Sequence, residues 1–296
     1  MNQYYQLRLA GNIIRILPRR FAYRLSDLLA ALFCARDYKG RTTVIANLRR
    51  VYSHTNRPTD DATLERAARA TFRYFGRYLV DFFFFSRLTR NDLDRYIVME
   101  NTESLAWAHE RGRGTLLVTA HLGNWELGGA VVAALGHTIY AIALPQKDAR
   151  LDRYFQEQRR RRGMRLLFLG RAVRDIIDVL NRNETVALLA DRDYTGHNDM
   201  TPFFGAEAPM PRGPAWLASH TGTTLVPGFL LRRDDDRYCM RFGAPFVPEQ
   251  GMPLPAIQQH LCAVLEEEIG RNPCQWYMFQ EIWGGRGYGS GPPKLT

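Results

Sequence analysis

Residues 115–144, TLLVTAHLGNWELGGAVVAALGHTIYAIAL, decide the fold class of this chain. They begin with a mostly apolar run at 115–120, continue into a helical segment from about Asn124, and end in a second apolar run at 138–144. Short apolar runs are typical of buried strands, and strands that alternate with helices are typical of a sheet covered by helices. The alternation continues with apolar runs at 165–169, 185–190 and 224–231 and with helical segments near 148–162 and 171–182. The sequence therefore predicts an α/β fold with a central mixed sheet flanked by helices.

The residues before these strands are expected to form a helical N-terminal region. Residues 3–17 place apolar side chains such as Ile13 on one side and arginines on the other, which is the pattern of an amphipathic helix. Such a helix either packs on the protein's own core or lies in a membrane interface, and the sequence leaves both interpretations open. A further long helix is predicted from the cap at 59–61 to about Leu88.

The length of 296 residues suits one large α/β domain or two small ones. No internal repeat or low-complexity segment divides the chain. We therefore expect a single domain, with a helical N-terminal region over 1–110, an α/β core over 111–285 and a flexible tail over 286–296.

The chain is basic, with 40 lysines and arginines against 30 acidic residues and a formal net charge of +10. Only three of the 40 are lysines, so guanidinium groups, which suit phosphate and carboxylate recognition, carry the charge. A basic excess fits a nucleic acid, an anionic membrane surface, or a phosphorylated or acidic substrate. Nucleic acid is not expected, because no recognised binding module is present and the aromatic residues sit in apolar patterns.

Several protein classes are excluded by motifs that the sequence lacks. It contains no P-loop, no G-x-G-x-x-G after a strand, no G-x-S-x-G elbow and no H-E-x-x-H. The four cysteines form no C-x-x-C pair, and no histidines lie near them at a zinc spacing. We therefore expect neither a metal nor a bound cofactor.

The chain is expected to lack a secretory signal and a membrane span. Arg8 and Arg15 interrupt the apolar residues near the N-terminus, unlike the apolar core of a signal peptide. The uncharged stretch 127–146 is long enough to span a bilayer, but its glycines and Pro145 divide it into a short helix and a buried strand. A cytoplasmic setting with reduced thiols follows as an expectation.

His121 is the first candidate for chemistry, because it follows the strand at 115–120 and loops at the carboxyl ends of strands carry the functional groups of such sheets. Glu126 lies five residues later, in the first turn of the next helix. A carboxylate bonded to one ring nitrogen makes the other a better base. Gly123 permits a tight turn, and N–H groups at the helix N-terminus are able to stabilise a developing oxyanion. The alternative is a structural histidine that caps the helix, and the residues alone leave both open.

Three further segments carry groups that suit substrate binding. The basic run at 159–165 either forms a solvated helix end or binds the phosphates of a carrier or lipid head group. The ADRDY motif at 190–194 follows a buried strand, and its charged groups either hold a polar acceptor or pair with one another. The PFFG motif at 202–205 begins a Pro/Gly-rich stretch with the composition of a ligand-covering loop. The candidate binding residues are Asn124, Arg159, Arg171, Asp191, Arg192 and Asp193.

Together these motifs resemble those of the bacterial lipid A biosynthesis acyltransferases, the lauroyl and myristoyl transferases, and of the related phosphatidylinositol mannoside acyltransferases. The matching segments are NLRRVY (47–52), TAHLGNWELGG (119–129), R-x-x-x-G (159–163), GR (170–171), ADRDY (190–194), PFFG (202–205) and QWYMFQEIW (275–283). They fall in the family's order over nearly the whole chain. A histidine and an acidic residue with four residues between them are weakly specific alone, but the later motifs at these intervals make the resemblance specific.

The resemblance implies a membrane-associated O-acyltransferase. Such an enzyme moves a fatty acyl group from a thioester of acyl carrier protein or coenzyme A to a hydroxyl of a glycolipid. A lipid A precursor is the implied acceptor, with a phosphatidylinositol mannoside or another lysolipid as the alternative. His121 would be the general base and Glu126 the group that orients its ring. The implied fold is related to that of the glycerol-3-phosphate acyltransferases, and the thioester is a co-substrate rather than a cofactor.

Many members of this family have an N-terminal membrane-spanning helix, whereas residues 3–17 here are short and carry arginines. We therefore expect peripheral attachment at the cytoplasmic face of the inner membrane, through this helix and a basic surface. Two alternatives stay open: a lipid-binding protein without turnover, and a hydrolase in which water replaces the lipid hydroxyl.

Overall fold

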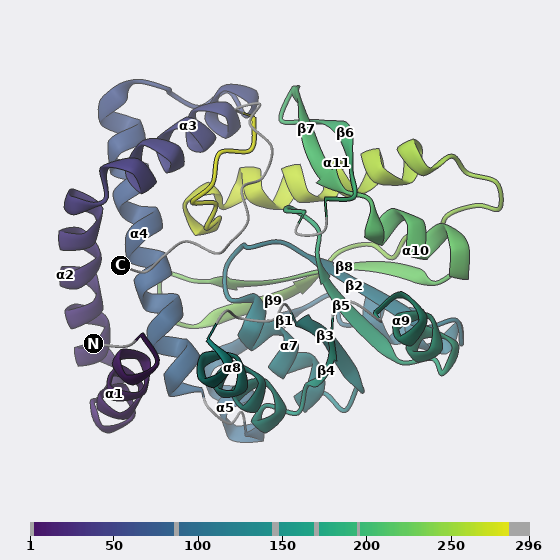
Figure 1. The fold of residues 1–296 in the computed structure, drawn as a ribbon, viewed down its shortest axis with the longest axis horizontal. Helices are drawn as coiled ribbons and strands as arrows, with labels where there is room; N and C mark the ends of the chain where they lie inside the picture. The colour runs from purple at the N-terminus through teal and green to yellow at the C-terminus, as the bar shows by residue number, and fades with distance from the viewer. Residues whose placement is uncertain (1–2, 86–88, 144–147, 169–171, 194–195, 284–296) are drawn as a thin grey trace.

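The computed structural model describes residues 3–85, 89–143, 148–168, 172–193 and 196–283 (Figure 1). The predicted tail at 286–296 lies outside the described residues.

Seven strands form the central sheet. They are β1 (Ile97–Glu100), β2 (Thr115–Thr119), β3 (Ile139–Ala143), β4 (Arg165–Phe168), β5 (Thr185–Leu189), β8 (Thr224–Arg232) and β9 (Tyr238–Phe242). Their order in the sheet is β1-β9-β8-β2-β5-β3-β4. In the run from β8 through β2, β5 and β3 to β4, each strand is parallel to the next, whereas β9 is antiparallel to β8. The sheet is therefore mixed, which confirms the predicted fold class. The sequence analysis did not predict β1 or β9, and β1 lies within the region expected to be helical.

Helices cover both faces of this sheet and extend beyond one end of it (Figure 1). They are α1 (Gln3–Ile16), α2 (Arg19–Arg36), α3 (Tyr38–His54), α4 (Asp61–Phe84), α5 (Arg90–Tyr96), α6 (Glu103–Glu110), α7 (Trp125–Ala134), α8 (Ala149–Arg161), α9 (Ala172–Asn181), α10 (Gly213–Thr221), α11 (Leu254–Arg271) and the 3-10 turn η1 (Pro273–Gln275). Alternate strand residues point to opposite faces, so that Leu116 packs with α9, α10 and α11 while Leu117 packs with α6 and α7.

The N-terminal helices form a separate layer beside the sheet. α4 lies between α2 and the α/β core, and α2 lies at the outer edge of the molecule (Figure 1). The side chain of Asp60 caps α4 by accepting from Thr63 N–H at 2.9 Å. The helix ends at Phe84, before the predicted end at Leu88, and the buried guanidinium of Arg162 donates to the carbonyls of Phe82 and Phe85 at this end.

No helix among the described residues has both the length and the apolar character required to cross a bilayer.

The PFFG motif forms the turn of a separate hairpin of β6 (Asn198–Phe203) and β7 (Ala206–Pro211). Phe203 and Phe204 are buried and contact the rings of Trp276 and Trp283. The aromatic side chains of this motif therefore belong to the core. In the stretch expected to cover a ligand, the later residues Pro211, Gly213 and Trp216 line a cavity that is described below.

Candidate active site

The carboxyl ends of β2 and β5 bring His121 and Asp191 together. The two strands are neighbours, and their parallel register pairs Thr119 with Leu189. Each of the two candidate residues lies two positions beyond this pair, so the register sets them opposite one another. The Nδ1 atom of His121 lies 2.9 Å from Oδ1 of Asp191, and the backbone N–H of His121 donates to Oδ2 at 2.9 Å. One carboxylate therefore holds both the ring and the backbone of the histidine.

Asp191 is fully buried, yet its surroundings favour the ionised form. Burial by itself raises the pKa of this carboxyl, but the charge of His121 and the hydrogen bonds from His121 and Trp276 outweigh burial and lower the pKa below its ordinary value. The bond from Nε1 of Trp276 measures 2.9 Å. A carboxylate at Nδ1 favours the tautomer with its proton there, which leaves the lone pair of the neutral ring on Nε2. The arrangement suits a general base.

A second carboxylate, Glu126, is bound by Arg159 of α8. Nε of Arg159 lies 3.1 and 3.0 Å from the two carboxylate oxygens, and Nη2 lies 2.5 Å from Oε1. Burial raises the pKa of Glu126, but the charge of Arg159 and its hydrogen bonds, with smaller contributions from Arg162 and then His121, lower it overall. The family resemblance implies that Glu126 orients His121. In the structure Asp191 makes that hydrogen bond, because the first turn of α7 directs Glu126 toward α8.

The loop between β2 and α7 is held by a tight turn and by the C-terminal segment. Gly123 has φ of +64°, and a Cβ at this position would collide with the carbonyl oxygen of Leu230. Gly123 N–H donates to the carbonyl of Gln275 at 2.9 Å, and Tyr277 N–H donates to the carbonyl of His121 at 2.8 Å. The end of η1 and the residues after it therefore pair with the loop that carries His121. Their long sequence separation from His121 explains why spacing alone did not predict these contacts.

Asn124 caps α7 rather than facing open space. Its Oδ1 accepts from Leu127 N–H at 3.0 Å, it is almost fully buried, and its Nδ2 donates to the hydroxyl of Tyr238 at 3.3 Å. Tyr238 belongs to a buried group that we call the Asp81 cluster. Its members are Arg19, Tyr23, Asp81, Arg232 and Tyr238. The predicted binding residue Asn124 is thus engaged by protein groups, which favours a positioning role.

The other predicted binding residues separate in space. Asp193 is buried and accepts from Nδ2 of Asn198 at 3.0 Å, so the two carboxylates of the ADRDY motif have different partners. Arg192 is almost buried and lines the cavity described next. Arg171 lies outside the described residues. Within the basic run, Arg159 binds Glu126 and Arg162 caps α4, so neither is part of a solvated helix end.

An apolar cavity of about 290 Å³ begins beside this site. Trp125, Glu126 and Arg159 line it at the polar side, and the ring of Trp125 lies 5.1 Å from that of His121. Apart from Thr119, Arg192 and Asp193, apolar and small residues line the remainder. They include Leu117, Gly128, Gly129, Ala141, Met164, Ile176, Ala187, Leu188, Trp216, Leu217, Gly228 and Met240. Small residues on β3, β5, β8 and α7 thus leave room for an extended apolar group in the core.

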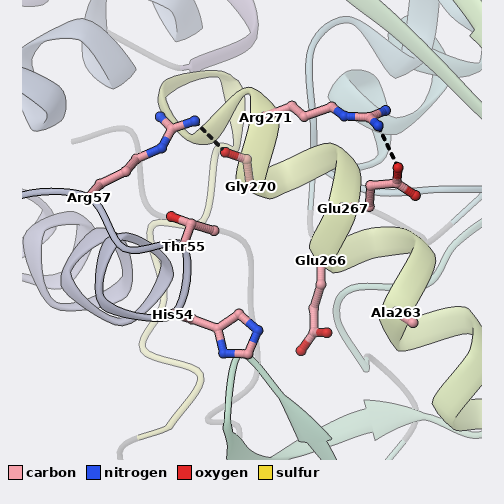
Figure 2. Close-up of a pocket in the computed structure, with 8 residues that line it drawn as sticks. All are labelled: His54, Thr55, Arg57, Ala263, Glu266, Glu267, Gly270 and Arg271. Carbon is pink, nitrogen blue, oxygen red and sulfur yellow. Dashed lines mark hydrogen bonds and ion pairs between the residues drawn. The ribbon is translucent and has the colours of Figure 1, made fainter.

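A second hollow, of about 430 Å³, lies between the end of α3 and α11 (Figure 2). Its charged side chains bind protein groups: Arg57 donates to the carbonyl of Gly270 at 2.7 Å, and Arg271 pairs with Glu267 at 2.5 Å. Glu266 accepts from the backbone N–H of Phe204. No residue that lines this hollow was a candidate for chemistry.

Among the described residues, no group of three or more histidine, cysteine or carboxylate side chains is arranged to hold a metal ion.

Comparisons with known proteins assign the chain to a family. The phosphatidylinositol mannoside acyltransferase of Mycolicibacterium smegmatis is 28% identical over 275 residues, which cover 92% of this chain and 88% of the relative. That of Mycobacterium tuberculosis is 28% identical over 283 residues, covering 91% and 85%. The lipid A biosynthesis palmitoleoyltransferase of Escherichia coli is 25% identical over 186 residues, covering 62% and 60%. The family model for bacterial lipid A biosynthesis acyltransferases matches residues 4–284. The chain therefore belongs to the bacterial lipid A biosynthesis acyltransferase family and is an acyltransferase.

Proposed function

We propose that the protein transfers a fatty acyl group from a thioester to a hydroxyl of a membrane glycolipid. The observation that carries the proposal is the His121–Asp191 pair at the carboxyl end of the sheet, next to an apolar cavity. A base beside an apolar cavity suits the attack of an alcohol on the carbonyl of an acyl chain that the cavity holds. A lipid-binding protein without turnover has no need of a buried carboxylate on a histidine, so this pair argues against that alternative.

In the proposed reaction His121 Nε2 accepts the proton of the acceptor hydroxyl while the hydroxyl oxygen attacks the thioester carbonyl. Asp191 holds the ring in the productive tautomer and stabilises the imidazolium that forms. The tetrahedral intermediate then collapses by breaking the C–S bond. The thiolate takes the proton back from His121, so that an ester and a free thiol are the products. The donor is a thioester of acyl carrier protein or coenzyme A, and it acts as a co-substrate.

Glu126 and Arg159 have a different role in this proposal. The carboxylate holds the guanidinium at the rim of the cavity by three short contacts. A fixed positive group beside the reacting carbonyl stabilises the negative charge that develops on its oxygen. We therefore assign oxyanion stabilisation to Arg159 and the positioning of Arg159 to Glu126. Arg192 and Asp193 line the same cavity and are proposed to contact the acceptor.

Two acceptor classes fit. The family description points to a lipid A precursor, the acceptor that the sequence motifs also imply. The relatives that match over most of this chain are phosphatidylinositol mannoside acyltransferases, whereas the lipid A palmitoleoyltransferase matches over less of it. That difference in coverage supports a mannoside acceptor as the second candidate. Both acceptors are anionic glycolipids, which agrees with the net charge of the chain. We further propose peripheral attachment to the cytoplasmic face of the inner membrane through α1.

The test is release of free thiol from acyl-coenzyme A and from acyl-carrier protein, with a lipid A precursor, phosphatidylinositol mannoside or no acceptor. Release stimulated by one glycolipid, and absent in His121→Ala, is the expected result. Equal release with and without acceptor would instead identify a hydrolase. Equal traces from His121→Ala and the unaltered protein would remove His121 from the mechanism.

A further inference from the structure

The outer faces of α1 and α2 carry most of the large apolar side chains that the described residues leave exposed. Ten of fifteen such side chains belong to these two helices, and they are between 38% and 84% exposed. We call this set the docking face. Its members are Tyr5, Leu9, Ile13, Ile16, Phe21, Leu25, Leu28, Leu29, Leu32 and Phe33. An apolar set of this size on two adjoining helices marks an interaction surface.

The spacing shows that each helix contributes a single stripe. In α1 the exposed apolar positions recur every three or four residues, and in α2 the same spacing runs from Phe21 to Phe33. The opposite side of α2 is packed on the protein, where Ala22, Tyr23 and Cys34 are buried. α2 therefore has two apolar faces, and packing on α4 accounts for only one of them.

Exposed arginines border both stripes. Arg8 and Arg15 lie beside the stripe of α1, and Arg20 and Arg24 lie beside that of α2. An apolar stripe with a basic border is the pattern of a helix that lies in the interface of an anionic bilayer, where apolar groups enter the acyl region and guanidinium groups meet phosphates. The border therefore favours a lipid surface over a protein groove.

We propose that α1 and α2 together form one surface that docks on an anionic lipid bilayer. The proposal deepens the peripheral attachment proposed above and rests on it, and it makes α2, which supplies six of the ten side chains, the larger part of the surface. α2 is also tied to the catalytic sheet. Arg19 and Tyr23 bind Asp81, which in turn accepts from the hydroxyl of Tyr238 on β9 at 2.5 Å. The docking face therefore has a fixed orientation relative to the loop of His121.

The test is sedimentation of the full-length protein with vesicles of phosphatidylcholine alone or of phosphatidylcholine with phosphatidylglycerol. The unaltered protein should bind the anionic vesicles more tightly than the neutral ones. The variant Leu25→Ser/Leu28→Ser/Leu32→Ser should bind at least about tenfold more weakly, because it removes apolar groups that enter the bilayer. Arg20→Gln/Arg24→Gln should lose the preference for anionic vesicles while it keeps binding to neutral ones.

The control Trp107→Ser/Met200→Ser removes exposed apolar side chains from α6 and β6 and should bind as the unaltered protein does. Binding by the leucine variant equal to that of the unaltered protein would overturn the proposal, as would equal binding to neutral and anionic vesicles. A dimer in solution that the leucine substitutions dissociate would instead identify the face as an interface between two copies.

Thiol release from a short, soluble acyl thioester should be the same in the leucine variant as in the unaltered protein. If the unaltered protein releases no thiol from this thioester, the proposed acyl transfer is contradicted, whereas the docking proposal is not affected.

Discussion

The imidazole of His121 and its own backbone N–H are bound by the two oxygens of one carboxylate. Such a two-point contact fixes the ring relative to the strand that precedes it. Because Asp191 also accepts from Trp276, its oxygens are satisfied within the protein and the carboxylate does not require water to remain ionised. The ring of His121 is thus oriented by groups from β2, β5 and the C-terminal segment.

Asp191→Asn is expected to lower kcat about 100-fold or more, because the amide neither stabilises the imidazolium nor enforces the tautomer with the proton on Nδ1. Thiol release under saturating donor measures this. Asp193→Asn is the matched control, since Asp193 is equally buried but binds Asn198. It should affect KM for the acceptor more than kcat. A larger loss of kcat in Glu126→Gln than in Asp191→Asn would restore Glu126 as the group that orients His121.

Removing either partner of the Glu126–Arg159 pair should destabilise the fold. Glu126→Gln is expected to lower the free energy of unfolding by roughly 2–3 kcal/mol, because it leaves a mostly buried guanidinium without its counter-charge. The double variant Glu126→Gln/Arg159→Met should be more stable than the sum of the single changes predicts. Urea denaturation of the unaltered protein, Glu126→Gln, Arg159→Met and the double variant measures the coupling free energy between the two side chains. Additive effects would mean that the pair contributes nothing beyond its separate members.

The lowered pKa values of Asp191 and Glu126 predict how stability depends on pH. A carboxyl whose folded-state pKa lies below its unfolded value stabilises the fold above the unfolded pKa, about 4, and loses that contribution as pH falls through the folded value. The stability difference between the unaltered protein and Asp191→Asn should therefore be full near neutral pH and shrink below about pH 4. Urea denaturation of both proteins between neutral pH and pH values below about 4 measures this difference. A constant difference would show that the carboxylate's charge is not what stabilises the site.

At the scale of single elements, the turn from β2 into α7 depends on one glycine. Gly123→Ala should cost on the order of 3 kcal/mol, because it combines a left-handed backbone with a collision against the Leu230 carbonyl. Gly112→Ala is the matched control: its φ is +69° but its Cβ would meet nothing within 4 Å, so it should cost about 1 kcal/mol. The urea concentrations at the midpoints of unfolding give the loss of stability in each variant. Equal losses would mean that the turn at Gly123 moves to accommodate the methyl group.

The Asp81 cluster joins elements that are distant in sequence. Asp81 of α4 binds Arg19 and Tyr23 of α2 and Arg232 and Tyr238 at the paired ends of β8 and β9. Tyr238 donates its single hydroxyl proton to Asp81, so its oxygen accepts from Asn124 and thereby sets the amide that caps α7. The surface helix α2 and the turn that carries His121 are in this way held by one buried carboxylate.

At the scale of the whole molecule, the apolar cavity is assembled from residues of the sheet and of helices on both faces. If it holds the acyl chain, its depth sets the chain length. Ala187→Leu, in the middle of β5, should shift the preferred donor toward shorter chains. Leu188→Met, which nearly conserves volume at the next cavity-lining residue of β5, on the other face of the sheet, should leave the preference unchanged. Rates for acyl-coenzyme A donors from octanoyl to palmitoyl measure both. An unchanged preference in Ala187→Leu would place the acyl chain elsewhere.

The local sequence by itself determined the alternation of strands and helices, the amphipathic α1, and the candidacy of His121. These follow from short-range periodicity, because a buried strand or an amphipathic helix is visible in the order of its own residues. The motifs around His121 also identified the family correctly. Each of these predictions concerns residues that are close together in the chain.

Only the tertiary structure decided which groups meet. β5 lies between β2 and β3 although β3 and β4 precede it in the chain, so Asp191 reaches His121 across 70 positions and Trp276 reaches Asp191 across 85. Strand order and register set such pairs, and neither follows from local pattern. The sequence likewise did not show that α2 has a second, exposed apolar face. An apolar residue shows whether it is core or surface only when the packing of the whole chain leaves it covered or exposed.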